Sequence, residues 1–234
     1  MSMKDLNNFS GFPKETLDFL TELKLNNNRE WFNNHKQEYL EYIINPAKSF
    51  VVTLGESLQE NISTEIRYDL RLNGSGSIMR IHRDIRFKKD KTPYNTRLRT
   101  VFWEGTGKKM NHPGFFIGFD ASGGWVYGGL HRFDKLSLDK YRKIVVSKQG
   151  EEIETVIESL NGLNYNIGGL HYKRTPRGYD NSHPRAKYLL FNGLYAISPS
   201  IEPARFINSK IIDVCLNHCL NMDSLHNLLV KIVD

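Results

Sequence analysis

The order in which the hydrophobic period changes along the chain is the strongest constraint on its fold. Up to about residue 60, apolar residues recur at helical spacing, as at Leu17, Leu20 and Leu23. From about residue 64 they alternate with polar residues, which predicts strands, and helical spacing returns at about 134–146, 151–160 and 202–234. The predicted strands are Ile66–Leu72, Ile78–Ile85, Leu98–Trp103, Phe115–Phe119 and Trp125–Tyr127. Segregated helices and strands favour an α+β fold with a mainly antiparallel sheet over alternating βαβ units.

The chain length and composition fit one globular domain. The 234 residues include 39% hydrophobic and 12% aromatic residues, enough apolar surface for a core. No low-complexity linker or internal repeat divides the chain. We therefore predict a single domain over residues 1–234. This domain has an N-terminal helical part at about 12–60, a sheet-rich part at about 64–130, and a mixed and helical part at about 133–234. Within the first part, one helix is expected at about 29–44.

The basic character of the chain is local. The net charge is only +6, and a mild global excess of cations is a weak argument for nucleic-acid binding. Residues 71–109, however, hold eleven Lys or Arg residues against three acids, an excess of eight, so the rest of the chain is slightly acidic. Two cysteines, no signal-peptide pattern and no long apolar run predict a cytoplasmic protein without a membrane span.

The densest group of chemically active side chains lies between Arg80 and Tyr94. On a strand, Arg80, His82, Asp84 and Arg86 would share one face, and Ile81, Arg83, Ile85 and Phe87 the opposite, core-facing one. Arg83 interrupts the apolar face, and a buried Arg requires a partner such as Asp90 or Glu30. The functional interpretation is an anion site, because guanidinium groups match phosphate or carboxylate oxygens. The alternative interpretation is a structural ion-pair lattice.

Three other segments carry polar groups. The loop from Lys173 to Asp180, followed by His183, combines cations, a carboxylate and an imidazole, and it reads either as part of a site or as a solvated basic turn. Asn28 is placed to cap a helix, and its polar neighbours could line a pocket nearby. Cys215 and Cys219 are predicted to be core thiols, because the second ligand pair that a zinc site needs is missing.

The motifs together resemble a known family. They are Phe12-Pro13, Asn27-Asn28-Arg29-Glu30-Trp31-Phe32, Arg80 to Phe87, Asp90-Lys91-Thr92-Pro93-Tyr94, and Arg174 to Asp180 with His183-Pro184. This set resembles the uncharacterised family known as domain of unknown function 2461 (DUF2461), over about residues 9–206. The resemblance carries no established activity and no agreed catalytic residue.

Three functions follow from these residues as hypotheses. The first is an enzyme or ligand-binding protein for a small anion, in which arginines and a lysine bind the anion and aspartates carry out the chemistry. The second is a nucleic-acid-binding protein in which aromatic residues stack on bases, and the third is an interaction module whose charges are structural. The preponderance of Arg and the interspersed Asp residues favour the first. No metal site is predicted, and the sequence leaves the cofactor and the oligomeric state open. The predicted catalytic residues are Asp84 and Asp90. We expect the Arg80–Tyr94 segment and the Arg174–His183 loop to meet around one pocket. The predicted anion ligands are Arg80, Arg83, Arg86, Lys91 and Arg177.

Overall fold

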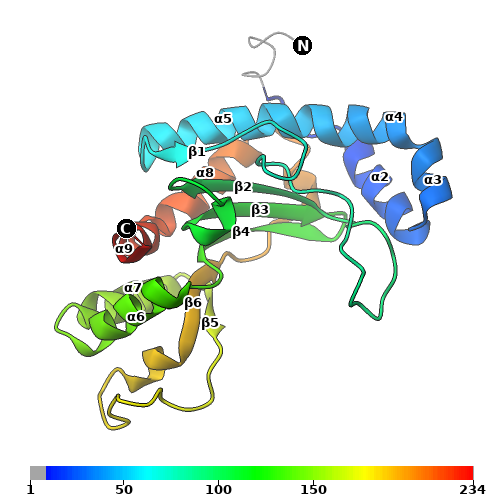
Figure 1. Ribbon diagram of the computed structural model, residues 1–234. Coiled ribbons are helices and arrows are strands. Elements are labelled where there is room, and N and C mark those ends of the chain that lie inside the picture. Colours follow the sequence, from blue (N-terminus) through cyan, green and yellow to red (C-terminus); the bar gives the residue numbers. More distant parts are fainter. Residues whose placement is uncertain (1–8, 234) are drawn as a thin grey trace. The chain divides into compact units, whose positions relative to one another are not determined.

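The computed structural model describes residues 9–233 and shows an α+β protein with a six-stranded antiparallel sheet. The strand order is β1-β2-β3-β4-β6-β5 (Figure 1). The strands are β1 (Ile66–Arg67), β2 (Leu98–Glu104), β3 (Gly114–Asp120), β4 (Gly123–Leu130), β5 (Asn166–Leu170) and β6 (Phe191–Ile197). The predicted fold class is confirmed.

Residue contacts divide the chain into two compact units. Among the described residues, the first consists of 9–102, 116–126 and 200–217, and the second of 103–115, 127–199 and 218–233. The prediction of a single globular domain stays a prediction.

The first unit holds the N-terminal helices. They are α2 (Lys14–Leu25), α3 (Arg29–Asn34), α4 (Lys36–Glu38), the π-helical turn η1 (Tyr39–Ile44) and α5 (Asn45–Asn61). Its core is aromatic: Phe12 lies 5.4 Å from Phe50 of α5 and 4.7 Å from Phe119 of β3, measured between ring centroids. The first unit also contains the 3₁₀ turn η4 (Pro203–Arg205) and most of α8 (Ile211–Asn221).

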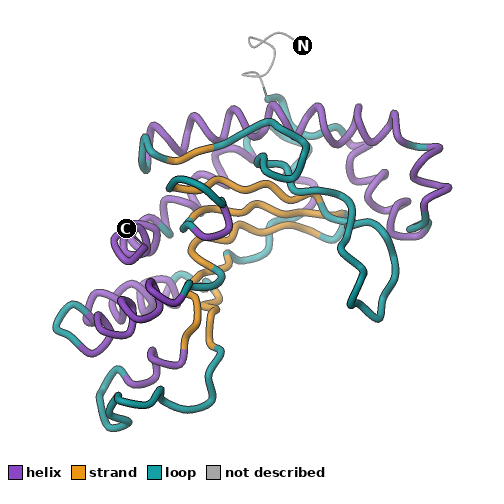
Figure 2. Tube along the Cα trace, in the orientation of Figure 1, coloured by secondary structure: helices purple, strands orange, loops and turns teal. Residues whose placement is uncertain are grey.

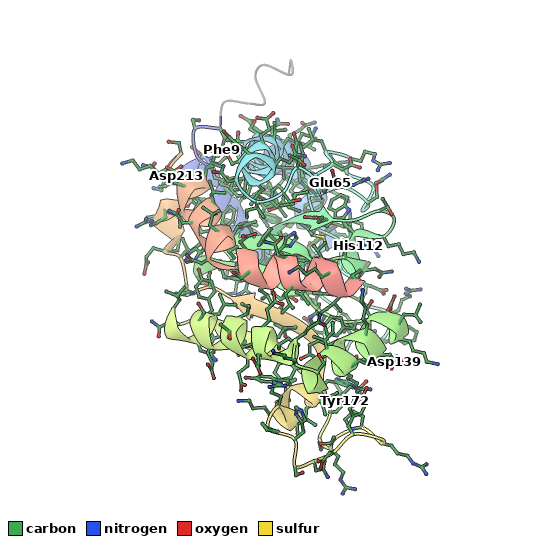
Figure 3. All side chains as sticks on the ribbon, turned by 90° about the vertical axis from the view of Figure 1, so that its left-hand side faces the viewer. Phe9, Glu65, His112, Asp139, Tyr172 and Asp213 are labelled. Atoms are coloured by element: carbon green, nitrogen blue, oxygen red, sulfur yellow. The ribbon has the colours of Figure 1, made fainter. Side chains whose placement is uncertain are left out.

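The second unit packs three helices around its own core. They are α6 (Lys135–Val146), α7 (Gly150–Gly162) and α9 (Asp223–Val233), and short 3₁₀ turns η2 (Lys109–Asn111) and η3 (Ala186–Leu190) complete the unit. Tyr141 is fully buried and donates a 3.1 Å hydrogen bond to the carbonyl of Tyr188. In both units, acids such as Glu65, Asp139 and Asp213 are exposed (Figure 3).

Two predicted strands are mostly loop. Ile66–Leu72 forms only the two-residue β1, and Ile78–Ile85 makes only the isolated bridges Ile78 to Thr100 and His82 to Tyr94. Figure 2 shows the stretch between β1 and β2 as a long loop. Pairing around the His82 bridge is brief: the Arg83 N–H donates to the Pro93 carbonyl, but Pro93 has no N–H to donate in return.

The expected helix at about 29–44 is interrupted. The helix α3 ends at Asn34, because the next residue, His35, has a non-helical backbone (φ −107°, ψ +18°), and its Nδ1 atom lies 2.7 Å from the Trp31 carbonyl. The chain then continues through α4 into η1. Asn28 caps α3 as predicted: its side chain accepts from the Trp31 N–H at 2.9 Å.

The edge strand β5 and its neighbour β6 were not expected from the sequence. Gly168 and Gly169 read as loop residues, yet they lie in β5, which pairs antiparallel with β6 and contains a bulge between Gly168 and Leu170. Gly169 has a φ of +112°, and a Cβ there would lie 2.0 Å from the Gly193 carbonyl oxygen. Here glycine permits close approach of two strands and does not mark a loop.

Candidate functional site

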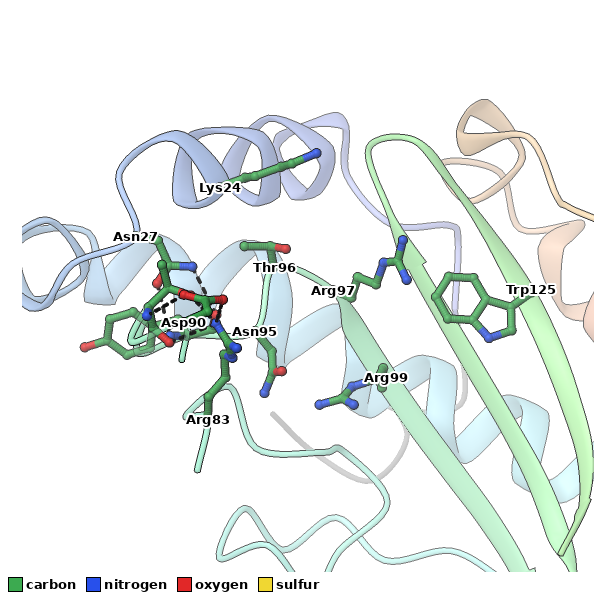
Figure 4. A pocket seen from close by; sticks show the side chains of 11 residues that line it. Lys24, Asn27, Arg83, Asp90, Asn95, Thr96, Arg97, Arg99 and Trp125 are labelled. Atoms are coloured by element: carbon green, nitrogen blue, oxygen red, sulfur yellow. Dashed lines mark hydrogen bonds and ion pairs between the residues drawn. The ribbon is translucent and has the colours of Figure 1, made fainter. Parts of the chain in front are cut away.

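A polar pocket of about 520 Å³ lies on the first unit (Figure 4). Its lining contains four cationic side chains and one carboxylate. The cations are Lys24, Arg83, Arg97 and Arg99, the carboxylate is Asp90, and the other lining residues are Asn27, Thr92, Tyr94, Asn95, Thr96 and Trp125. We call this the cationic pocket.

The sheet places three of these residues side by side. Arg99 lies in β2 and Arg97 directly precedes that strand; the two are two positions apart in sequence and both line the pocket, and Trp125 projects from β4. Gly118 of β3 lies between them, and a Cβ at that position would be 3.1 Å from the Trp125 ring and 3.4 Å from the Arg99 Cγ. The missing side chain of Gly118 therefore makes room for both residues.

Arg97 is held from two directions. Its Nε lies 2.5 Å from an Asp120 carboxylate oxygen, and its guanidinium lies 4.6 Å from the centre of the Trp125 ring. Burial raises the pKa of Asp120, but hydrogen bonds from Ser122 and Arg97 outweigh it and hold this pKa below its usual value. The ion pair and the ring contact together fix Arg97 at the edge of the pocket.

Arg99 is a half-buried cation of the pocket, and it has no anionic partner among the described residues. Its side chain is half-buried and points into the pocket, beside Arg97. In the described chain, no carboxylate lies within ion-pairing distance of its guanidinium, and no side-chain hydrogen bond holds it. Burial and the like charge of Arg97 both lower the pKa of Arg99. An arginine in such a position is costly unless an anion binds there.

Arg83 and Asp90 form the opposite wall of the pocket. Arg83 Nη1 donates to Asp90 Oδ2 at 2.7 Å and to the Thr92 carbonyl at 3.0 Å, and it also contacts the Thr92 hydroxyl. The Asp90 carboxylate accepts from the Thr92 N–H at 2.9 Å. The Thr92 N–H, Arg83 and the Thr92 hydroxyl lower the pKa of Asp90 to about 2. The predicted pairing of Arg83 with Asp90 is thus present.

Asn27 joins the pocket to the N-terminal helices. Its side-chain amide pairs with the backbone of Tyr94 in both directions, accepting from the N–H and donating to the carbonyl, each at 3.0 Å. This contact fixes the loop before β2 against the end of α2, where Lys24 lines the pocket. The expectation that a polar neighbour of Asn28 lines a pocket is met by Asn27.

The other predicted residues lie elsewhere. Asp84 is exposed and binds Arg86 through both carboxylate oxygens, at 3.0 and 2.7 Å, while Lys91 Nζ donates to the Ile85 carbonyl at 3.0 Å. The Arg86 hydrogen bonds lower the pKa of Asp84 to about 2. Arg80 lines a different cavity of the first unit, and Arg177 is exposed in the second unit. The convergence of the Arg80–Tyr94 segment with the Arg174–His183 loop stays a prediction.

Sequence reasoning did not select Lys24, Arg97, Arg99 or Trp125 as site residues. The available signal was the spacing of Arg97 and Arg99, two positions apart at the beginning of the predicted strand Leu98–Trp103. The neighbouring strand that brings Trp125 beside them is known only from the fold.

The described residues contain no group of side chains that could form a metal centre. Across residues 9–233, no three His, Cys, Asp or Glu side chains are placed to hold a metal ion. Within the described residues, Cys215 and Cys219 form no disulfide bond, and both are buried, as predicted for core thiols. The helices in that same range include none that is long and apolar enough to cross a membrane.

Fold and site together define an α+β protein whose candidate site is a cationic pocket on an antiparallel sheet. The chain belongs to the family described as "Conserved hypothetical protein (DUF2461)", whose family model matches residues 15–227. A search of curated proteins finds no match to the sequence.

Proposed function

We propose that the protein binds a small anion, one that bears a phosphate or a carboxylate group, in the cationic pocket. The observation that carries this proposal is the half-buried Arg99, which has no anionic partner in the part of the chain that the structure describes. A structural lattice would pair each buried guanidinium with an acid, as Asp120 pairs with Arg97. Arg99 departs from that rule and points into open space.

The arrangement suits an anion with several oxygens. Arg99 offers a planar set of donors for two oxygens at once, and Lys24 offers a compact charge from α2. Asn95 and Thr96 add neutral polar groups to the lining. A bound anion would also relieve the repulsion between Arg97 and Arg99, a repulsion that contributes to the lowered pKa of Arg99.

Within this proposal Arg83 is the only one of the predicted anion ligands in the pocket, and Asp90 positions it. Arg86 and Lys91 are engaged in contacts within their own loop. A carboxyl group with a pKa of about 2, as in Asp84 and Asp90, is a weak general base at neutral pH. The geometry therefore supports ligand binding by arginines more than acid–base chemistry by these two residues.

Isothermal titration with inorganic phosphate, and separately with citrate, tests the proposal. We expect Arg99→Gln to weaken binding about tenfold or more, since hydrogen bonds to charged groups are worth roughly that factor. Arg99→Lys keeps the charge but loses the planar guanidinium group, so its affinity should lie between those of the unchanged protein and Arg99→Gln. Arg205→Gln is the matched control, because Arg205 is an exposed arginine of the same unit outside the pocket. Equal affinity of Arg99→Gln and Arg205→Gln would reject the pocket.

A second candidate function, nucleic-acid binding, rests on the loop that carries Phe87. That side chain is 95% exposed, and Lys88 and Lys89 follow it directly. An exposed aromatic ring beside cations can stack on a base while the cations contact phosphates. Binding of a single-stranded oligonucleotide that falls steeply with salt, and is lost in Phe87→Ala but kept in Arg99→Gln, would favour this function over the first.

We also propose a cytoplasmic location. The support is that Cys215 and Cys219, within the described residues, are not joined in a disulfide, as expected in a reducing compartment.

A further inference from the structure

A second cavity, of about 230 Å³, lies on the first unit. Its walls are mainly apolar and include Phe32, Leu40, Ile44 and Ile78, whereas Lys36 and Arg80 are its exposed cationic members. The lining includes no carboxylate. An apolar cavity with only positive charge at its exposed residues differs in kind from the polar cationic pocket.

The shape of this cavity depends on the π-helical turn η1. The Asn45 N–H bonds the Leu40 carbonyl, five residues back, so the turn is wider than an α-helical one. Residues five apart, such as Tyr39 and Ile44, are thereby brought toward the same side, and both line the cavity. Such turns are rare and are found frequently at functional sites.

Neither exposed cation is paired. Within residues 9–233, Lys36 and Arg80 form no ion pair and no side-chain hydrogen bond. Asp84 is close enough to Arg80 for the charge to lower the Asp84 pKa slightly, but Arg86 occupies both oxygens of that carboxylate. Arg80 therefore keeps its donors available for a ligand.

An aromatic stack separates the two sites. Phe32 and His82 line the apolar cavity, Tyr94 lines the cationic pocket, and the Phe32 and Tyr94 rings are stacked at 4.3 Å. Arg80 and Arg83 diverge to opposite sides of this wall, because they lie three positions apart in a segment whose exposure alternates residue by residue.

We infer that the apolar cavity binds a small monocarboxylate with an apolar body. The carboxylate is held by Arg80 and Lys36, and the body fills the space between Leu40, Ile44 and Phe32. The volume equals that of about eight water molecules in the liquid, which limits the buried part to a short alkyl chain or one aromatic ring. This inference is independent of the function proposed for the cationic pocket.

The experiment uses the whole protein and a series of straight-chain carboxylates, followed by ¹H–¹⁵N NMR shifts at Ile78–His82. Affinity should rise about threefold to fourfold per methylene group from butanoate, and then level off near octanoate when the cavity is full. Octanol, which has the same chain without the charge, should bind about tenfold more weakly than octanoate.

Variants separate the two sites. Arg80→Gln and Lys36→Gln replace exposed residues, so they should fold normally, and each should weaken octanoate binding about tenfold. Arg99→Gln, in the cationic pocket, should leave octanoate binding unchanged. The inference is overturned if octanoate does not bind at millimolar concentration, if octanol binds equally well, or if Arg99→Gln abolishes octanoate binding while Arg80→Gln does not.

Discussion

Arg97 and Arg99 are identical side chains two positions apart, but their surroundings differ. Asp120 and Trp125 hold Arg97 in place, whereas Arg99 lies beside it without a partner in the described residues. Two like charges this close destabilise the unliganded protein. The repulsion between Arg97 and Arg99 lowers the stability of the unliganded protein, and a bound anion would remove it. Such locally destabilising arrangements are common at binding sites.

This repulsion gives a test at the level of one residue. Arg99→Gln removes a half-buried charge and its repulsion with Arg97, so the thermal midpoint should stay the same or rise while phosphate affinity falls. A structural arginine would give the opposite result, with loss of stability on substitution. Differential scanning calorimetry without and with phosphate measures both effects on one sample, and a clear fall of the midpoint without phosphate would contradict the prediction.

The carboxylate of Asp90 provides a test by pH. Its pKa in the folded protein, about 2, lies below the ordinary value for Asp, roughly 3.9. The stabilisation from its contacts with Thr92 and Arg83 is therefore complete above about pH 4 and is lost as the pH falls through about 2. Carboxyl ¹³C NMR should show Asp90 ionised at pH 3.5. Titration of Asp90 at an ordinary pH would mean that these contacts do not persist in solution.

At the level of elements, β2, β3 and β4 build one wall of the cationic pocket, because their residues alternate between two faces. Phe102, Phe119 and Val126 point toward the buried side, and Arg99, Gly118 and Trp125 belong to the opposite one. A single residue without a side chain, Gly118, lets the two large groups approach each other across β3.

Gly118→Ala should therefore disturb the pocket without breaking the sheet. The new methyl group would meet the Trp125 ring at 3.1 Å, so the ring must shift and its contact with Arg97 must weaken. We expect a changed tryptophan fluorescence spectrum and weaker phosphate binding at nearly unchanged helix content. Gly162→Ala is the matched control, because a Cβ at Gly162 meets nothing within 4 Å. Equal phosphate affinity of the two variants would contradict the expected role of Gly118.

The N-terminus of α3 offers a second test of elements. Asn28 accepts a hydrogen bond from the Trp31 N–H at 2.9 Å, and loss of such a cap costs about 1 kcal/mol. Asn28→Ala should lower the free energy of unfolding by about this amount in urea denaturation, whereas Asn28→Asp should retain most of it, since Asp caps equally well. Equal losses in both variants would show that the cap contributes little.

Elements with a strong and uninterrupted pattern could be predicted from the sequence. Phe115–Phe119 is a short apolar run that follows the turn residues Pro113-Gly114, and α6 has helical spacing, so both were expected near their observed bounds. The segment 78–85 also alternates, and its exposure follows that alternation, but its pairing is limited to two isolated bridges, and Pro93 in the opposing segment has no N–H to extend the second one. Periodicity thus predicted which way Arg80 and Arg83 would diverge, although it overestimated the hydrogen bonding.

The site was harder to predict, because its residues come from distant parts of the sequence. Arg83 and Asp90 could be paired from their local spacing, and that pair is present. Lys24 and Trp125 join the pocket only through the packing of α2 and the pairing of β4, which no local pattern encodes. Asp84 and Arg86 belong to the dense charged motif, but they are exposed and form an ion pair with each other. A dense group of charges in the sequence therefore need not face a pocket.

For the whole molecule, the two compact units share the middle strands of the chain. The boundary falls inside β2, between Phe102 and Trp103, and inside β3 and β4, between Phe115 and Phe116 and between Val126 and Tyr127. A strand is stabilised by hydrogen bonds along its whole length, so melting of one half removes the support of the other half. Units divided in this way differ from domains joined by a linker, whose boundaries lie in exposed segments that few contacts cross.

We therefore expect one cooperative unfolding transition, as predicted for a single domain. Val51→Ala in α5 and Ile153→Ala in α7 each remove a fully buried side chain, one from each unit, and each deletion should cost about 1–5 kcal/mol. Each should lower the midpoint of the same transition, followed by calorimetry, far-UV circular dichroism and tryptophan fluorescence together. Phosphate bound to the first unit should raise that midpoint in all variants, including Ile153→Ala, because a ligand of the native state stabilises everything that unfolds with its site. If Ile153→Ala instead produced an early transition that phosphate did not shift, the two units would unfold independently and the single-domain prediction would be wrong.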